Sequence, residues 1–347
     1  MSHDFRRPTV GQRRSALALL TAWGLFAIVG SGGGISVDAP ECSFFSNTCN
    51  PTVGPSSPLA SSSVSPARAT VQVGASVTFT VRSFGVDNPA YQWQRSAGGG
   101  RSYVDIAGAT GSTYTLAAAN LADDGVLFTA SVRGSAGVVA GLAQGVGRLA
   151  VSSMPAVVLQ DSEFLSTDWR VAAIASPALN GPTHSEERAT DGGHPGAFRR
   201  MQHVMPAGPS ELQVTHVSLT QTYDPALQGA IHVIDHAAEC LMLSNTTSTY
   251  RLSTQLLVEQ GARRFVTVTL DCPFTVWNET PSVASLIALD FTLLDGPPCG
   301  AGESCPDFSA TASPLHFGYV RRSQAVAGVG GAITHGIDNW KVTVWRR

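Results

Sequence analysis

The amino-acid sequence predicts an all-β protein, with a small sandwich and then a larger antiparallel sandwich behind an N-terminal signal segment. Two observations predict this class. Short segments in which apolar and polar residues alternate recur from Ala67 to the end of the chain, and this period of two is typical of half-buried strands. The 35 glycines and 20 prolines supply the turns that many short strands need.

The composition narrows the classes of partner. Charged residues make up 14% of the chain and hydrophobic residues 43%, which suits a folded core and argues against disorder. The formal net charge of −3 provides no broad positive field for phosphates or anionic lipids. We therefore expect no nucleic acid partner, and contact with a membrane only through an uncleaved leader.

The N-terminus indicates export. Residues 1–14 are polar and basic, and Ser15 to Gly30 form an uncharged apolar run that ends at Ser31 and three glycines. This order is typical of a secretory signal, and the run is short for a membrane-spanning helix, which needs about 20 residues. We expect a signal peptide at residues 1–31 and a secreted, periplasmic or cell-surface product. An uncleaved membrane anchor is the alternative.

Six cysteines follow the leader, and an even number in an exported chain indicates disulfides. Their spacing favours two local loops, Cys42–Cys49 and Cys299–Cys305, and leaves Cys240–Cys272 as the third pair. No Cys-x-x-Cys pair is present, which disfavours the alternative of a zinc site.

Residues 32–66 are rich in glycine, serine and proline, and we expect a flexible linker that carries the small Cys42–Cys49 loop. From residue 67 the alternating pattern begins. Val77, Phe79 and Val81 share one face of a predicted strand, with threonines on the other face. Further short strands are expected in AYQWQR, YVDIAG, STYTLAA, VLFTASVRG and GRLAVSS, and they predict a sandwich over residues 67–152.

The stretches GASVTFTV, YQWQR with Trp93, DIAGATGSTYTL and ADDGVLFTASV resemble the bacterial immunoglobulin-like domains of the I-set type. The resemblance covers about a quarter of the chain. The two cysteine positions of the family would fall at Val81 and Ala130, so this domain would lack the disulfide between its sheets. The resemblance then implies that Trp93 packs on Val81 and Ala130 in an apolar cluster.

About ten further strands and no convincing helix predict a larger sandwich over residues 155–347. EFLSTDW, DGGHPGAF at residues 191–198 and GIDNWKVTV resemble jelly-roll, concanavalin-like or laminin-type domains, a group that includes carbohydrate-binding modules. The resemblance implies binding of sugars or extracellular surfaces more often than catalysis.

Catalytic motifs are absent from the sequence: no nucleophile elbow, phosphate loop or His-Glu-x-x-His is found, so no catalytic residue is assigned. Pyranose faces stack on aromatic rings, and nearby polar groups fix the orientation of the sugar. The expected ligand-binding residues are therefore Trp277 with its neighbour Asn278, Trp169 and Tyr223, and Trp345 is a further candidate. Core packing is the alternative for each ring.

The resemblance to carbohydrate-binding jelly rolls implies a structural calcium between acids near the first strand and an aspartate near the last. In this chain these are Asp161, Glu163 and Asp338, and calcium accepts such oxygen ligands. The alternative is that they are ordinary turn carboxylates. Asp161 and Glu163 also have the alternate spacing of a hydrolase acid pair.

These observations favour a non-catalytic secreted or cell-surface protein that binds an extracellular glycan or surface protein through its C-terminal sandwich. A glycoside hydrolase or polysaccharide lyase on a concanavalin-like fold is the first alternative. A purely structural envelope protein is the second.

Overall fold

The computed structural model describes residues 61–347, apart from 136–138, 143–144, 176–180, 247–249, 273–274, 280–281, 295, 301–304 and 326–328. The predicted signal segment, most of the predicted linker and the Cys42–Cys49 pair lie outside the described residues. Within them, no helix has the length and apolar character needed to cross a bilayer. The segment Ser57–Arg347 behaves as one compact unit by its internal contacts.

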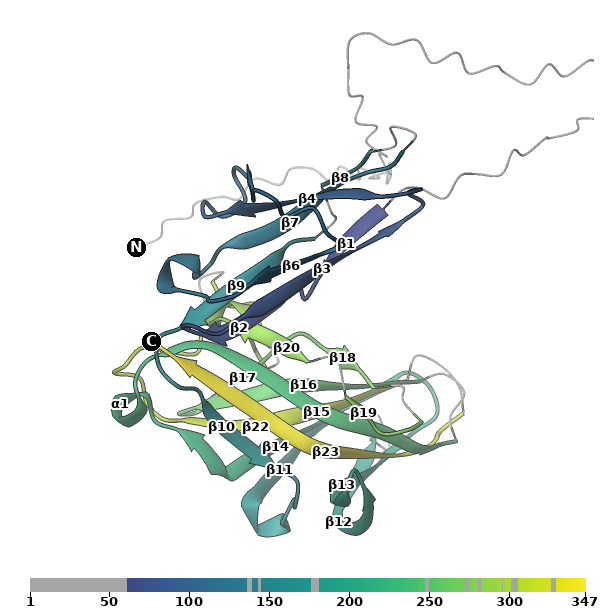
Figure 1. The fold of residues 1–347 in the computed structure, drawn as a ribbon. Helices are drawn as coiled ribbons and strands as arrows, with labels where there is room; N and C mark the ends of the chain where they lie inside the picture. The colour runs from purple at the N-terminus through teal and green to yellow at the C-terminus, as the bar shows by residue number, and fades with distance from the viewer. Residues whose placement is uncertain are drawn as a thin grey trace, which may run out of the picture. The chain divides into compact units, whose positions relative to one another are not determined.

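The smaller sandwich is immunoglobulin-like and consists of two sheets (Figure 1). One sheet has the order β1–β3–β6, with bounds Ser61–Ser65, Val77–Phe84 and Thr113–Leu116. The other has the order β2–β9–β7–β4–β5, with β8 beside β7; its bounds are Arg68–Gln72, Gly147–Ser152, Leu127–Arg133, Ala90–Ser96, Val104–Asp105 and Val139–Leu142. Only the β2–β9 pair is parallel among the described pairs of this domain.

An apolar cluster fills the space between these two sheets. Trp93 lies opposite Ala130 across the β4–β7 pair, and both belong to one buried cluster with Val81. The indole N–H of Trp93 donates to the carbonyl of Gly111 at 2.9 Å, so the ring is buried with its polar atom bonded. The expected packing at the two vacant cysteine positions is therefore present.

The linker prediction differs from the structure at its end. β1 lies within the predicted tether and pairs with β3 through five residues. Ser62 and Val64 of β1 are buried, and the strand is an edge held by backbone hydrogen bonds. A strand in which most residues are serine has little apolar contrast, so alternation could not reveal it.

The larger sandwich packs two seven-stranded antiparallel sheets against each other (Figure 1). One sheet has the order β12–β13–β23–β15–β19, with β10 beside β23 and β20 beside β15; its bounds are Thr183–Gly193, Gly196–Met205, Gly331–Arg346, Ile231–Asn245, Asn278–Glu279, Val157–Asp161 and Val283–Leu286. The other has the order β11–β14–β22–β16–β17–β21, with β18 beside β16; its bounds are Trp169–Ala175, Ser210–Tyr223, Leu315–Ala325, Tyr250–Gln260, Arg263–Val266, Thr292–Leu293 and Leu270–Asp271. The short helical turns are η1 (Leu121–Asp123), η2 (Ser166–Asp168), α1 (Pro225–Gln228) and η3 (Ala288–Asp290).

Two buried features hold these sheets together. The main apolar cluster includes Trp169, Phe317 and Trp340. The Cys240–Cys272 disulfide joins β15 of one sheet to the end of β18 in the other, which confirms that predicted pair. Gly318 permits a close strand approach, because a Cβ there would lie 2.0 Å from the carbonyl oxygen of His216.

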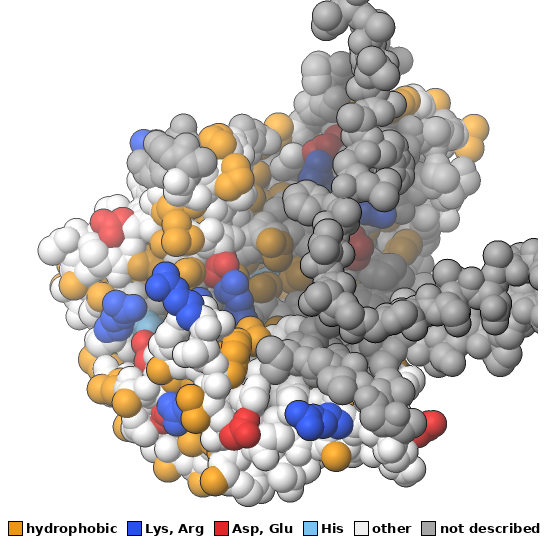
Figure 2. Space-filling view, turned by 90° about the horizontal axis from the view of Figure 1, so that it is seen from above, with side chains coloured by type: hydrophobic (Ala, Val, Ile, Leu, Met, Phe, Trp, Pro, Cys, Tyr) orange, Lys and Arg blue, Asp and Glu red, His pale blue; other side chains and the backbone are white. Residues whose placement is uncertain are grey.

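Polar contacts join the two sandwiches within the segment 57–347. The Arg68 guanidinium of β2 forms a two-point ion pair with Asp290, at 2.5 and 2.8 Å, and also donates to the carbonyl of Ser285. His232 lies 2.8 Å from a carboxylate oxygen of Asp124. On the face in Figure 2, described side chains of both charges are interspersed with hydrophobic ones, which fits the small net charge.

Candidate functional site

A solvent-open groove of about 290 Å³ lies where β10, β15 and β23 meet. It is lined by Gln160, Asp161, Ser162, Ala237, Ala238, Glu239, Asn339, Trp340 and Lys341. The β15–β23 register shifts between Ala237 and Glu239, and Asn339 has φ of 48°. An irregularity of this kind bends a strand and re-aims its side chains, and asparagine tolerates positive φ better than most residues. The bulge therefore places the Asn339 amide and the Glu239 carboxylate together at the groove.

A hydrogen-bond network fixes these polar groups. Glu239 accepts from Asn339 Nδ2 at 3.3 Å, and one of its oxygens lies 2.9 Å from His194 Nδ1. Asn339 Nδ2 also donates to the carbonyl of His194. Because these contacts cross from β23 to β15 and to the β12–β13 turn, the groove is rigid on one side while its Lys341 side is exposed.

Asp338 lies behind the groove and is fully buried. One of its carboxylate oxygens accepts the backbone N–H of His194 at 2.6 Å and the other accepts that of Asn339 at 2.7 Å. Burial raises the pKa of this carboxyl, the two N–H donors lower it, and the charge of Glu239 raises it further. Asp338 thus organises the turn that carries His194. Gly193 of that turn has no room for a side chain, since a Cβ would lie 2.7 Å from Asp338 Oδ2.

Trp277 is half-buried and lies beside the same turn. Its indole N–H donates to the carbonyl of Gly192 at 2.7 Å, and its ring meets Phe198 edge-to-face with centroids 5.2 Å apart. The following strand, β19, pairs with β15 at Glu239 and Cys240. Trp277 therefore stands one strand away from the groove carboxylate, with its ring orientation fixed. The side chain of Asn278 lies outside the described residues.

Two of the predicted ligand-binding rings are core residues, which is a correction. Trp169 is 4% exposed and contacts Phe164, Tyr319 and Trp340, and Tyr223 is fully buried with its hydroxyl donating to the carbonyl of Gly229. Their ring faces are covered by the sandwich itself, so neither can stack on a sugar. Trp345 is half-buried and donates its indole N–H to Asp235 at 2.7 Å.

The three predicted calcium ligands each have another contact. Asp161 accepts the backbone N–H groups of Glu163 and Phe164 and the indole N–H of Trp169. The Glu163 side chain is 66% exposed and pairs with Arg188. Among the described residues, no group of three acidic, histidine or cysteine side chains is arranged to hold a metal ion. Calcium binding stays a prediction.

Cys299 and Cys305 differ from the prediction. The two residues are not joined by a disulfide in this structure, although their side chains hydrogen-bond to each other. Burial and this contact raise the pKa of the Cys299 thiol to about 12. The predicted bridge is one oxidation step from the arrangement observed.

The sequence analysis missed Glu239, Asn339, His194 and Lys341 as members of one site. They come from two strands, β15 and β23, and from the β12–β13 turn, and the register of β15 on β23 brings Glu239 beside Asn339 and Lys341. One local signal was available: Asp338 and Asn339 interrupt an otherwise apolar strand pattern, as residues at a bulge do.

Comparison with known proteins adds a partial match. No protein-family model matches the chain. A stretch of 116 residues, 33% of this chain, is 39% identical to part of endoglucanase C of Cellulomonas fimi, of which it spans only 10%. Two solved marsupial T cell receptor structures are similar at 11% and 12% identity over 45% of this chain and 93% and 91% of theirs, with a TM-score of 0.22 that carries no further argument.

Proposed function

We propose that this chain is an exported, non-catalytic protein that binds a glycan in the groove between β10, β15 and β23. The observation that carries the proposal is the hydrogen-bonded amide and carboxylate of Asn339 and Glu239, which lie with the exposed Lys341 at one concave surface. Sugar hydroxyls donate and accept hydrogen bonds, and such convergent polar groups are what orient a ligand in a concave site.

Three further observations support the proposal. Trp277 offers a half-exposed ring one strand from the groove. The partial match to an endoglucanase makes polysaccharide the first ligand class to test. The buried Cys240–Cys272 disulfide suits an oxidising compartment outside the cytosol.

Pull-down of the full chain on insoluble polysaccharides, cellulose first, together with a glycan array, tests the proposal. We expect Asn339→Gly to weaken binding at least about tenfold, because the hydrogen bonds from the Asn339 amide to the glycan are lost. A tenfold change corresponds to about 1.4 kcal/mol of binding free energy. Glycine is chosen because it keeps the positive φ of this position. Gln202→Ala, which changes an exposed residue of β13, is the matched control and should bind normally.

No retention on any polysaccharide or array glycan would overturn the proposal and favour a structural envelope protein. Equal losses in Asn339→Gly and Gln202→Ala would place the binding surface elsewhere. Both variants should keep the circular dichroism spectrum of the parent, since Asn339 and Gln202 are not core residues.

A second candidate is glycoside hydrolysis in the same groove. The observation that favours it is the cross-strand pair of Glu239 and Asp338, because glycoside hydrolysis uses two neighbouring acids and burial raises the pKa of Asp338. Release of reducing ends from soluble glucans by the parent, lost in Glu239→Gln while binding is retained, would establish it. Binding without release is the outcome expected under the proposal above, since Asp338 is fully buried and both of its oxygens are occupied.

A further inference from the structure

The strand β11, Trp169–Ala175, ends one sheet of the larger sandwich and has one unpaired side. It pairs with β14 through seven consecutive residues without a register shift, and among the described residues it pairs with no other strand. An unpaired side presents backbone N–H and C=O groups that a further strand can bind. After Arg170 the strand contains only valine, alanine and isoleucine, so residues 171–175 form an uncharged edge.

The other strands at the margins of this sandwich have features that normally prevent strand addition. β12 carries Glu186, Glu187 and Arg188 and is interrupted by a register shift. β18, β19 and β21 have two residues each, and β20 has four. In β10, the backbone N–H of Gln160 is already bonded to the side chain of Gln221. Charges, short strands and irregularities protect sheet edges, and the edge of β11 has none of them over residues 171–175.

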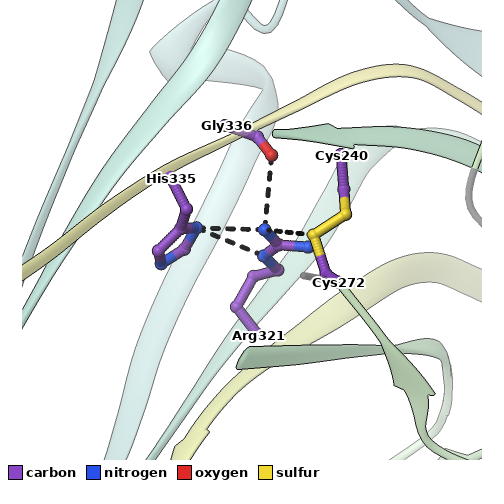
Figure 3. Close-up of a disulfide and its surroundings, with 5 residues drawn as sticks. All are labelled: Cys240, Cys272, Arg321, His335 and Gly336. Carbon is purple, nitrogen blue, oxygen red and sulfur yellow. Dashed lines mark hydrogen bonds between the residues drawn. A yellow bond between two sulfur atoms is a disulfide. The ribbon is translucent and has the colours of Figure 1, made fainter. Parts of the chain in front are cut away.

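The opposite side of the same sheet is closed. The Cys240–Cys272 disulfide joins the end of β18 to β15 of the facing sheet, and Figure 3 shows the Arg321 guanidinium beside it. Arg321 donates to Cys272 Sγ at 3.6 Å and to the carbonyl of Gly336 at 3.3 Å. Because a covalent bond and short strands fix this side, β11 is the side at which the sheet can gain a strand.

The side chains of β11 are partly open where a further strand would cover them. Ala173 lies opposite the fully buried Val214 and therefore faces the interior, as does Val171, which packs on the same cluster. Ala173 is nevertheless exposed, and Val171 is only half-buried. On the outer face, Arg170 is already paired with Glu259. A strand added at this edge would bury apolar side chains without burying an unpaired charge.

The sequence of β11 is complementary to itself in the antiparallel direction. With Ala172 on a two-fold axis, Val171 lies opposite Ala173 of a second copy, and Arg170 lies opposite Ile174 of that copy. A larger side chain then meets a smaller one on the inner face, and no two like charges are opposite each other. A second copy of this chain therefore fits the edge in both size and charge.

We propose that this protein forms a two-fold symmetric homodimer in which the β11 strands of two copies pair antiparallel and join two sheets into one. A strand pair of this length buries a small area, so the dimer is weak, with a Kd on the order of micromolar. The groove takes no part in the contact, because β10, β15 and β23 belong to the other sheet. Dimerisation is thus independent of glycan binding.

The variants Ala172→Lys and Ala172→Glu test the axis, because each places two like charges opposite each other. Sedimentation velocity of the full chain at about 1–200 µM, a range that spans a micromolar Kd, measures the dimer. We expect the parent to dimerise and each variant to lower the association constant at least about tenfold. An equimolar mixture of the two variants should dimerise again, because opposite charges then face each other. Ala226→Lys, at an exposed position of α1, is the matched control and should dimerise as the parent does.

Three results would overturn the proposal: a parent that stays monomeric throughout, a dimer of equal strength in Ala172→Lys, or a mixture of the two variants that stays monomeric. Circular dichroism first checks that both variants fold. If either does not, hydrogen–deuterium exchange of the parent replaces the variants. Amides of residues 171–175 should exchange more slowly at dimer-forming concentrations than in dilute protein, and exchange that is independent of concentration would exclude the β11 contact.

Discussion

The two sandwiches of this chain solve the same packing problem with different chemistry. The immunoglobulin-like domain fills its core with apolar residues around Trp93, whose single polar atom is bonded to Gly111. The larger sandwich has an apolar cluster around Trp340 and, beside it, a layer with two arginines and several histidines. A disulfide braces the second sandwich, whereas the core of the first contains Val81 and Ala130 and no disulfide among the described residues.

The stability of the smaller core therefore depends mainly on the apolar area that it buries. The stability of the larger core depends also on the charges of its buried side chains. Apolar burial contributes roughly in proportion to area and is insensitive to protonation. Buried histidines and arginines respond to pH and to counter-ions, so the two sandwiches should respond differently to the same change of solution. The predictions that follow use that difference.

Acid should unfold the larger sandwich first. Burial lowers the pKa of His203 to about 3 and of His236 to about 4, and also lowers the pKa of His216 and His335. The unfolded chain therefore binds more protons than the folded one between the ordinary pKa of about 6.5 and those values. Stability is fully present above about pH 6.5 and falls as the pH drops, by about 1.4 kcal/mol per histidine and pH unit.

Two-dimensional NMR of the full chain between pH 7 and 4 measures this, because signals from the two sandwiches are followed separately. The summed loss for four histidines over about two pH units is comparable with the whole free energy of unfolding of a typical domain, about 5–15 kcal/mol. The signals of the larger sandwich should therefore disappear near pH 5. Loss of the immunoglobulin-like signals first would contradict the comparison, since the described part of that core contains no histidine. Arg199, Arg321, His184 and Tyr319 surround the titrating rings, and the repulsion from the arginines adds to the effect.

A matched pair of tryptophan substitutions gives a smaller effect. Trp93 and Trp340 are both fully buried, but the indole N–H of Trp340 has no acceptor among the described residues, whereas that of Trp93 donates to Gly111. Both Trp→Phe changes lose similar volume, and only Trp93→Phe also loses a hydrogen bond, whereas Trp340→Phe removes an N–H that has no acceptor among the described residues. We expect Trp93→Phe to destabilise its domain by about 1–2 kcal/mol more than Trp340→Phe does.

Urea unfolding followed by circular dichroism, with each variant measured against the parent, gives the two free energies. Equal losses would mean that the Trp93 bond contributes nothing net. A larger loss in Trp340→Phe would mean that its N–H is bonded in solution.

The sequence predicted a strand and its buried face well only where the two faces of that strand differ clearly in polarity. In the smaller domain, alternation predicted the strands, and the resemblance to immunoglobulin-like domains predicted the packing of Trp93 on Val81 and Ala130. In the larger domain, AFRRMQHVM places Arg199, Met201 and His203 in phase, with Arg200 and Gln202 on the other face. Both faces of this strand carry polar side chains, so the period of two did not indicate which face is buried.

The candidate site was hidden for a different reason. Its parts are brought together by a register shift, and a shift of one residue moves every side chain of a strand to the opposite face. Trp169 and Tyr223 were wrong as ligand-binding residues because a tryptophan or tyrosine in a strand has the same sequence pattern whether its face is covered or open. Trp277, next to a turn, was the one ring that local sequence placed in a partly open position.

The smallest expected effect concerns calcium, whose three predicted ligands lie near the groove but not as one group. Asp338 and Asp161 already accept N–H bonds, so an ion would replace existing contacts and bind weakly. At ten times a millimolar Kd, binding adds about 1.4 kcal/mol, which raises the melting temperature by roughly 2–4 °C. We expect a rise no larger than this when calcium is added to chelator-treated protein, and its loss in Asp338→Asn. Asp191→Asn, at an exposed position near the same turn, is the control. An unchanged melting temperature after chelation would exclude the ion, and a rise retained in Asp338→Asn would place it on other ligands.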